Sequence, residues 1–187
     1  KVVDYVDGDT LPDVVSYSPD ASTNGHYFNG VVTMLSLTDG SQLWQLEGGA
    51  SLERLGEAVT IGADIDGDAL TDLILRSPGA STNGFYDNGS ISLVSGGSGQ
   101  LIWAAYGPGH GSAYGSSFKA VSDINGDGLQ DLLVGVPGES SNGMSENGAI
   151  RALSSVDGSQ QWEIFGTSNF GQLGSSFIDI GDVNGDG

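Results

Sequence analysis

Short apolar runs separated by glycine-rich polar turns make up the chain. The run LLVGV covers residues 132–136, and AIRAL at 149–153 and QWEIF at 161–165 follow after turn segments. A fourth segment, GSSFIDIG at 174–181, alternates apolar residues with small or polar ones. Such alternation, bounded by Gly, Asn and Asp, is typical of short β-strands. No segment keeps a helical period beyond a turn or two, so the pattern predicts an all-β protein of antiparallel strands with essentially no helix.

The strand pattern repeats every 59 residues without a gap. Three units fit the chain, at 9–67, 68–126 and 127–185, and a partial copy of one acidic loop stands at each end. A tryptophan recurs at one point of each unit, which favours packing between successive sheets over ligand binding. The residues that share this spacing include Asp9, Asp68, Asp127 and Asp186; Pro19, Pro78 and Pro137; and Trp44, Trp103 and Trp162.

The acidic loops DIDGDALTD (64–72) and DINGDGLQD (123–131) each precede a strand. Oxygen-bearing side chains occupy positions 1, 3, 5 and 9, position 7 can add its backbone carbonyl, and a glycine at position 4 permits a sharp turn. An all-oxygen set favours Ca²⁺ over zinc or copper, and the strict geometry of Mg²⁺ suits it less. The alternative is a solvated acidic turn without metal. The predicted ligands are Asp64, Asp66, Asp68, Leu70 and Asp72 in one loop, and Asp123, Asn125, Asp127, Leu129 and Asp131 in the other.

The loops at the two ends depart from this pattern. Tyr5 stands at position 1 of the first loop, so we expect a weaker or differently coordinated site there. The last loop stops at Gly187, before its ninth position, and needs a longer chain or a second molecule to close. An EF-hand is excluded, because Leu75 or Val134 stands where its closing Glu is required. The corresponding ligands are Asp7, Asp9, Leu11 and Asp13 in the first loop, and Asp182, Asn184 and Asp186 in the last.

Composition narrows the classes of function. The 187 residues carry 24 acidic and 5 basic side chains, a net charge of −19, which disfavours nucleic acid and anionic membrane surfaces as partners. No apolar run approaches the length of a membrane span, so no membrane insertion is expected. The chain has no cysteine for disulfides or thiolate ligands. It begins at Lys1 rather than Met, so we expect a segment of something longer or a processed product.

The stretch GSSFKAVSDINGDGLQDLLVGVPG, residues 115–138, resembles an FG-GAP repeat, as found in integrin alpha chains and in many bacterial secreted proteins. The "FG" position reads Leu55–Gly56, Tyr114–Gly115 and Leu173–Gly174, whereas only the proline persists at the "GAP" position. The resemblance implies a four-stranded blade per repeat, calcium in the loop between the first two strands, and a β-propeller of about seven blades. It also implies extracellular roles in adhesion and scaffolding.

Three units cannot close a propeller of that size, so the repeats form either part of a larger propeller or an open stacked array. We expect a calcium-binding, non-catalytic extracellular structural or adhesion module. The alternatives are a segment of an open-ended extracellular fibre and an accessory module of a secreted hydrolase or lyase. The expected partners are other copies of the same repeats or the rest of a longer chain, together with an extracellular protein or glycan ligand.

The histidines and serines give no sign of catalysis, and one asparagine lies in a glycosylation motif. His26 and His110 have no equivalents in the other units, and no serine lies in a G-x-S-x-G motif, so no catalytic residue is predicted. Asn88 begins the sequon NGS and is a candidate glycosylation site.

Overall fold

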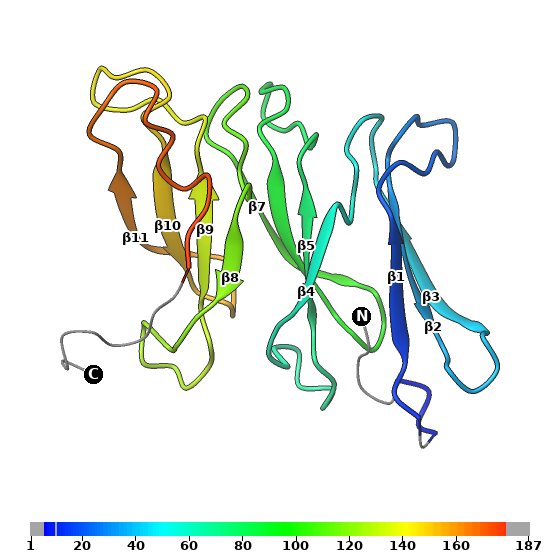
Figure 1. Cartoon of the computed structure of the whole chain (residues 1–187). Coiled ribbons are helices and arrows are strands. Elements are labelled where there is room, and N and C mark those ends of the chain that lie inside the picture. Colours follow the sequence, from blue (N-terminus) through cyan, green and yellow to red (C-terminus); the bar gives the residue numbers. More distant parts are fainter. Residues whose placement is uncertain (1–5, 10, 179–187) are drawn as a thin grey trace.

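A computed structural model describes residues 6–9 and 11–178, and these residues form eleven β-strands (Figure 1). The described part contains no helix, and thus none that could cross a membrane, which agrees with the predicted all-β class. The strands are β1 Val14–Ser18, β2 Val31–Leu35, β3 Gln42–Glu47, β4 Ala58–Ile61, β5 Leu73–Ser77, β6 Ser90–Val94, β7 Leu101–Tyr106, β8 Phe118–Ala120, β9 Leu132–Val136, β10 Ala149–Leu153 and β11 Gln160–Phe165.

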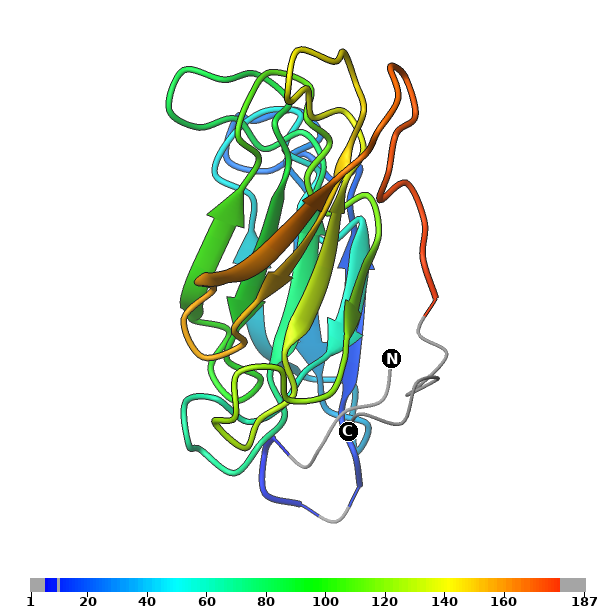
Figure 2. The same cartoon turned by 90° about the vertical axis from the view of Figure 1, so that its left-hand side faces the viewer.

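The strands form three antiparallel sheets in chain order. The first has the order β1-β2-β3 among the described residues, the second β4-β5-β6-β7 and the third β8-β9-β10-β11. The sheets stand in a row, as Figures 1 and 2 show from two directions. This arrangement agrees with propeller-type blades. Each four-stranded sheet begins with the strand that precedes an acidic loop, β4 or β8. The predicted repeat boundaries at residues 68 and 127 therefore fall inside the loop that connects the first two strands of a sheet. The expected strand at 174–181 lies partly outside the described residues.

Two apolar clusters join the sheets face to face. Between the first and second sheets, Val32 and Met34 of β2 pack with Leu73 and Leu75 of β5, and all four are fully buried. A second cluster joins the second and third sheets in the same way. The middle sheet is therefore covered on both faces, and all five residues of β6 are buried. A sheet buried on both faces reads as a continuous apolar or small-residue run rather than as strict alternation.

The recurring tryptophans lie at the junctions between sheets. Trp44 of β3 donates its indole N–H to the carbonyl of Gly96 at 2.9 Å, in the β6–β7 turn of the next sheet. Trp103 of β7 does the same to the carbonyl of Ser155 in the β10–β11 turn, at 2.7 Å. The predicted packing role is confirmed for these two residues. Trp162 of β11, on the last sheet, is 37% exposed.

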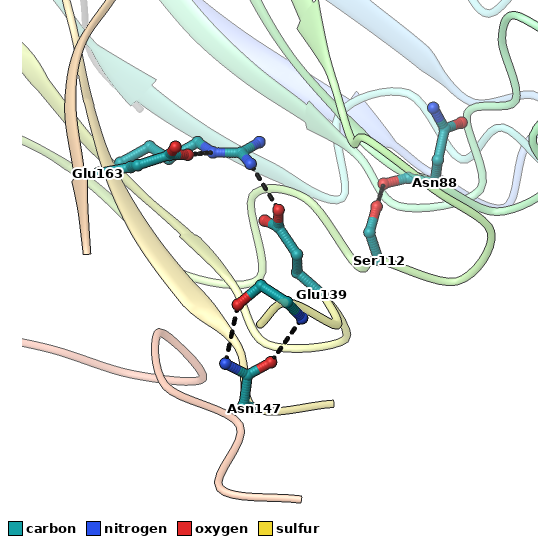
Figure 3. A network of polar contacts seen from close by, with 7 residues as sticks. Asn88, Ser112, Glu139, Asn147 and Glu163 are labelled. Atoms are coloured by element: carbon teal, nitrogen blue, oxygen red, sulfur yellow. Dashed lines mark hydrogen bonds and ion pairs between the residues drawn. The ribbon is translucent and has the colours of Figure 1, made fainter. Parts of the chain in front are cut away.

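A repeated asparagine closes the loops at the opposite end of each sheet from the acidic loops. The side-chain amide of Asn88 is fully buried: its Oδ1 accepts the N–H of Thr82 at 3.2 Å, and its Nδ2 donates to the Gly107 carbonyl at 2.8 Å. Asn147 forms the equivalent bonds to Ser141 and Gly166, and Figure 3 shows this residue with Asn88 and the neighbouring polar network. A glycan on the Asn88 nitrogen would not fit the folded chain, because that nitrogen is enclosed and already bonded.

Candidate metal centre

The acidic loops lie along the same edge of the sheets, one in each, at the bottom in Figure 1. Residues 64–72 connect β4 to β5, residues 123–131 connect β8 to β9, and the first loop precedes β1. Glycine supplies the left-handed turn at the centre of each loop, with φ of 77° at Gly8, 81° at Gly67 and 84° at Gly126. The repeated sequence therefore produces the same curl in each described loop.

Three carboxylates converge in the 64–72 loop. Asp64, Asp66 and Asp72 each place one oxygen within 4.8 Å of the others. Within the described part of the chain, no other group of three acidic side chains comes this close together. Two oxygens that bind one Ca²⁺ at about 2.3–2.6 Å lie at most about 5 Å apart. The separation therefore fits a single calcium ion held by one oxygen from each residue. Asp68 is not in this group, and its Oδ2 lies 3.5 Å from the hydroxyl of Ser95.

Backbone N–H groups hold these side chains in an inward-curled loop. The two oxygens of Asp64 accept the N–H groups of Gly67 at 2.7 Å and Ala69 at 2.9 Å. Asp68 Oδ1 accepts the N–H of Leu70 at 2.8 Å. Each carboxylate oxygen has two lone pairs, so an oxygen that accepts one N–H can still bind a cation. The loop is thus preorganised by its own backbone.

The ninth-position Asp72 is fully buried. Its Oδ2 accepts the N–H of Ile65 at 2.8 Å, and its Oδ1 accepts the N–H of Gly96 at 3.1 Å. Burial raises the pKa of Asp72, the two N–H donors oppose this shift, and the negative charges of Asp66 and Asp68 add to it. A divalent cation beside these three carboxylates would offset both the burial and the repulsion.

The 123–131 loop has the same curl with one different side chain. Asp123 accepts the N–H groups of Gly126 at 2.7 Å and Gly128 at 2.8 Å, and the donor Gly128 is the largest cause of a lowered pKa at Asp123. Asn125 replaces the acid at position 3, and its Nδ2 donates to Asp127 Oδ2 at 2.9 Å. Asp131 is fully buried. This loop has one carboxylate fewer than 64–72, and Asn125 presents an amide oxygen instead.

In the first loop, Asp13 is fully buried and accepts the N–H of Val6 at 2.5 Å. Asp9 accepts the N–H of Leu11 at 2.7 Å and the hydroxyl of Thr38, and the hydroxyl is the main cause of its lowered pKa. Asp7 is held by the N–H of Asp9 at 3.0 Å. The last predicted loop, with Asp182, Asn184 and Asp186, lies outside the described residues. Coordination by the carbonyls of Leu11, Leu70 and Leu129 stays a prediction.

One class of partners was missed by sequence reasoning. The ninth-position acids also bind the hairpin turn of their own sheet, through the N–H of Gly96 to Asp72 and of Ser155 to Asp131. These two donors are 59 residues apart, but their residue types differ and a backbone N–H leaves no trace in the sequence. The buried asparagines could have been found, because Asn29, Asn88 and Asn147 share the repeat spacing.

The curled acidic loops and the row of antiparallel sheets define a protein of propeller-type repeats. Comparison with family models identifies the repeat itself: residues 55–94 and 114–153 match the FG-GAP repeat. Both matches start at the "FG" position, and each contains one complete acidic loop. The chain therefore contains FG-GAP repeats, in agreement with the resemblance seen in the sequence.

Relatives of this chain among curated proteins include several integrin alpha chains. Integrin alpha-M of Mus musculus is 34% identical over 128 residues, which cover 60% of this chain and 11% of the relative. Integrin alpha-3 of Cricetulus griseus is 28% identical over 174 residues, with 84% and 16% covered. Human integrin alpha-8 is 31% identical over 140 residues, with 71% and 13% covered. The chain is thus integrin-alpha-like, and it spans only a small part of the length of these relatives.

Proposed function

We propose that this chain is a calcium-stabilised, non-catalytic adhesion or scaffold module that works outside the cell. The observation that supports it best is the convergence of Asp64, Asp66 and Asp72, with one oxygen each within 4.8 Å of the others. A chain of net charge −19 would not be expected to gather carboxylates there unless a cation offset their repulsion. The adhesive role comes from the likeness to integrin alpha chains.

In this proposal calcium has a structural role. Each complete loop connects the first two strands of a sheet, so an ion held there would restrain both strands and couple metal binding to folding. Asp64, Asp66, Asp68 and Asp72 would hold it in one loop, with Asp123, Asn125, Asp127 and Asp131 in the other, and the carbonyls of Leu70 and Leu129 completing the shells. The first loop would hold it through Asp7, Asp9, Leu11 and Asp13.

Isothermal titration calorimetry of the chelator-treated chain tests the metal site. We expect Ca²⁺ to bind, at the roughly 10⁻⁴–10⁻³ M common for extracellular calcium modules, and more tightly than Mg²⁺. Asp64→Ala should remove one binding event, whereas Asp87→Asn, an exposed acid outside the loops, should leave the titration unchanged. Equal titrations for the two variants would contradict the site.

The adhesive role needs a separate measurement. The calcium-loaded chain, immobilised as a folded module, should retain an extracellular matrix protein or a glycan from a defined panel. Retention should fall when chelator is added, because the loops and the sheets they join would loosen together. A module that binds calcium but retains nothing from the panel would support a purely structural role.

A further inference from the structure

Seven Asn–Gly pairs lie in the described part of the chain, and this dipeptide is chemically labile. The glycine nitrogen can attack the side-chain carbonyl carbon of the asparagine before it, because glycine has no side chain to shield it. A C–N bond forms, and the side-chain nitrogen leaves as ammonia with the former N–H proton. Water then opens the succinimide to aspartate or isoaspartate. The pairs begin at Asn24, Asn29, Asn83, Asn88, Asn125, Asn142 and Asn147.

Three of these pairs are held against the reaction by burial. The attack needs a free glycine nitrogen and an asparagine side chain that can turn toward it. The glycine after Asn88 donates its N–H to the Ala80 carbonyl at 3.1 Å, and the Asn88 side chain is fully buried. At the equivalent Asn29 and Asn147, the next glycine donates at 3.1 and 3.0 Å, and both side chains are fully buried. Neither reacting group is therefore available at these three positions.

The pair in the 123–131 loop is held by hydrogen bonds. Gly126 donates its N–H to Asp123 Oδ1 at 2.7 Å. The Asn125 side chain donates to Asp127 Oδ2 and accepts the N–H of Asp127, each at 2.9 Å. The curl of the acidic loop thus engages both reacting groups of this pair.

The other three pairs are exposed tips of tight turns. Asn24, Asn83 and Asn142 have φ of 52°, 54° and 54°, and the glycines after them have φ of 83°, 82° and 77°. Two left-handed residues in succession make the two-residue turn that favours Asn–Gly. In each turn, the residue after the glycine donates its N–H at 2.9 Å to the carbonyl of the residue before the asparagine. The N–H groups of the glycines themselves make no hydrogen bond among the described residues.

One of the three exposed asparagines is anchored. The Asn24 side-chain amide donates to the Glu47 carboxylate on β3. The residues equivalent to Glu47 are Tyr106 and Phe165, which offer no carboxylate. Within the described part of the chain, the side chains of the other two asparagines make no hydrogen bond, so they are free to rotate toward the next nitrogen.

We propose that Asn83 and Asn142 are sites of spontaneous deamidation in the folded protein, with Asn24 slower. The turn must open for the nitrogen to reach the side-chain carbon, and an exposed loop tip opens at little free-energy cost. The pair at Asn88 opens only when its sheet does. The products place a new carboxylate at the tips of loops on the edge of the sheets opposite the acidic loops (Figure 1). The proposal needs neither calcium nor an adhesive role.

Peptide mapping by mass spectrometry tests the proposal, because each event exchanges NH₂ for OH and changes the mass of one peptide. The folded chain is incubated near neutral pH with saturating Ca²⁺. We expect Asn83 and Asn142 to react about tenfold or more faster than Asn88 and Asn147. The same chain incubated in urea is the matched reference: once the fold is lost, all these Asn–Gly pairs should react at similar rates.

Glu47→Ala tests the anchor on Asn24. Loss of this hydrogen bond should speed deamidation at Asn24 about two- to tenfold and leave the rate at Asn83 unchanged. Circular dichroism verifies that the variant is folded. Intact Asn83 and Asn142 in the folded chain, while the urea sample reacts, would overturn the proposal, as would equal rates at Asn83 and Asn88 in the folded chain. An unchanged Asn24 rate in Glu47→Ala would refute the slower reaction assigned to the anchored site.

Discussion

Asp131 and Trp103 bind opposite sides of one residue. The N–H of Ser155 donates to Asp131 Oδ1 at 3.2 Å, and the carbonyl of Ser155 accepts the indole N–H of Trp103 at 2.7 Å. The acid that ends an acidic loop is therefore connected, through one hairpin residue, to the tryptophan of the preceding sheet. A cation that fixes the loop would also fix the junction between sheets.

Calcium removal should lower the melting temperature of the whole chain. Without the ion, the clustered carboxylates repel and the loops loosen, and the connection through the hairpin turn extends this effect to the junctions between sheets. We expect a fall of many degrees in chelator, recovered by Ca²⁺ more fully than by Mg²⁺, in thermal melts followed by circular dichroism. Identical curves with and without chelator would exclude a structural ion.

Asp127→Ala and Asp39→Ala form a matched pair. In both residues a carboxylate accepts the N–H of the residue two positions later at 2.8 Å, in an exposed turn. In chelator the two variants should lose similar stability, about 1 kcal/mol each, for the exposed turn hydrogen bonds that each carboxylate accepts. With calcium, Asp127→Ala should lose markedly more in urea denaturation. Equal losses in both conditions would mean that Asp127 holds no ion.

Asn88→Ala should destabilise the second sheet strongly. The substitution leaves the part-buried N–H of Thr82 and the buried carbonyl of Gly107 without their partner, at about 1–3 kcal/mol each. The control is Gln45→Ala, an exposed amide on β3, which should change the free energy of unfolding by less than about 0.5 kcal/mol. A similarly small loss of unfolding free energy for both variants would show that the Asn88 amide does not stabilise the fold.

Glu139→Gln should be nearly neutral at pH 7, within about 1 kcal/mol, although Glu139 pairs with Arg151 at 2.7 Å (Figure 3). Burial raises the pKa of Glu139 more than the Arg151 charge lowers it, and Glu139 Oε2 is buried without a partner. Arg151→Met should instead cost about 3–5 kcal/mol, because it leaves the largely buried carboxylate of Glu139 uncompensated.

The sign of the pH dependence follows from the raised pKa. A carboxyl whose pKa is higher in the folded state contributes stability that is present below its unfolded pKa and is lost as the pH rises through the folded value. The glutamine variant has no such loss. Its free energy of unfolding, relative to the parent chain, should therefore rise between pH 4 and pH 7. Urea denaturation at the two pH values measures the difference, and a relative fall would contradict the shift.

Most of the local structure could be predicted from the sequence. The runs at 132–136 and 149–153 are β9 and β10 as expected, because strand alternation and turn residues act over a few positions. The packing of Trp44 and Trp103 followed from their recurrence. The glycan at Asn88 was suggested by a three-residue motif that carries no information on burial, and the fold encloses that side chain.

By itself, the sequence determined the 59-residue repeat, the short strands and the oxygen-rich loops, since each depends on neighbouring residues. Tertiary structure alone decided which oxygens of an acidic loop converge and that Asp72 binds Gly96. These features depend on contacts between residues far apart in the chain, 24 positions for Asp72 and Gly96 and 52 for Trp44 and Gly96. Such contacts form only when whole sheets pack, and no local pattern specifies them.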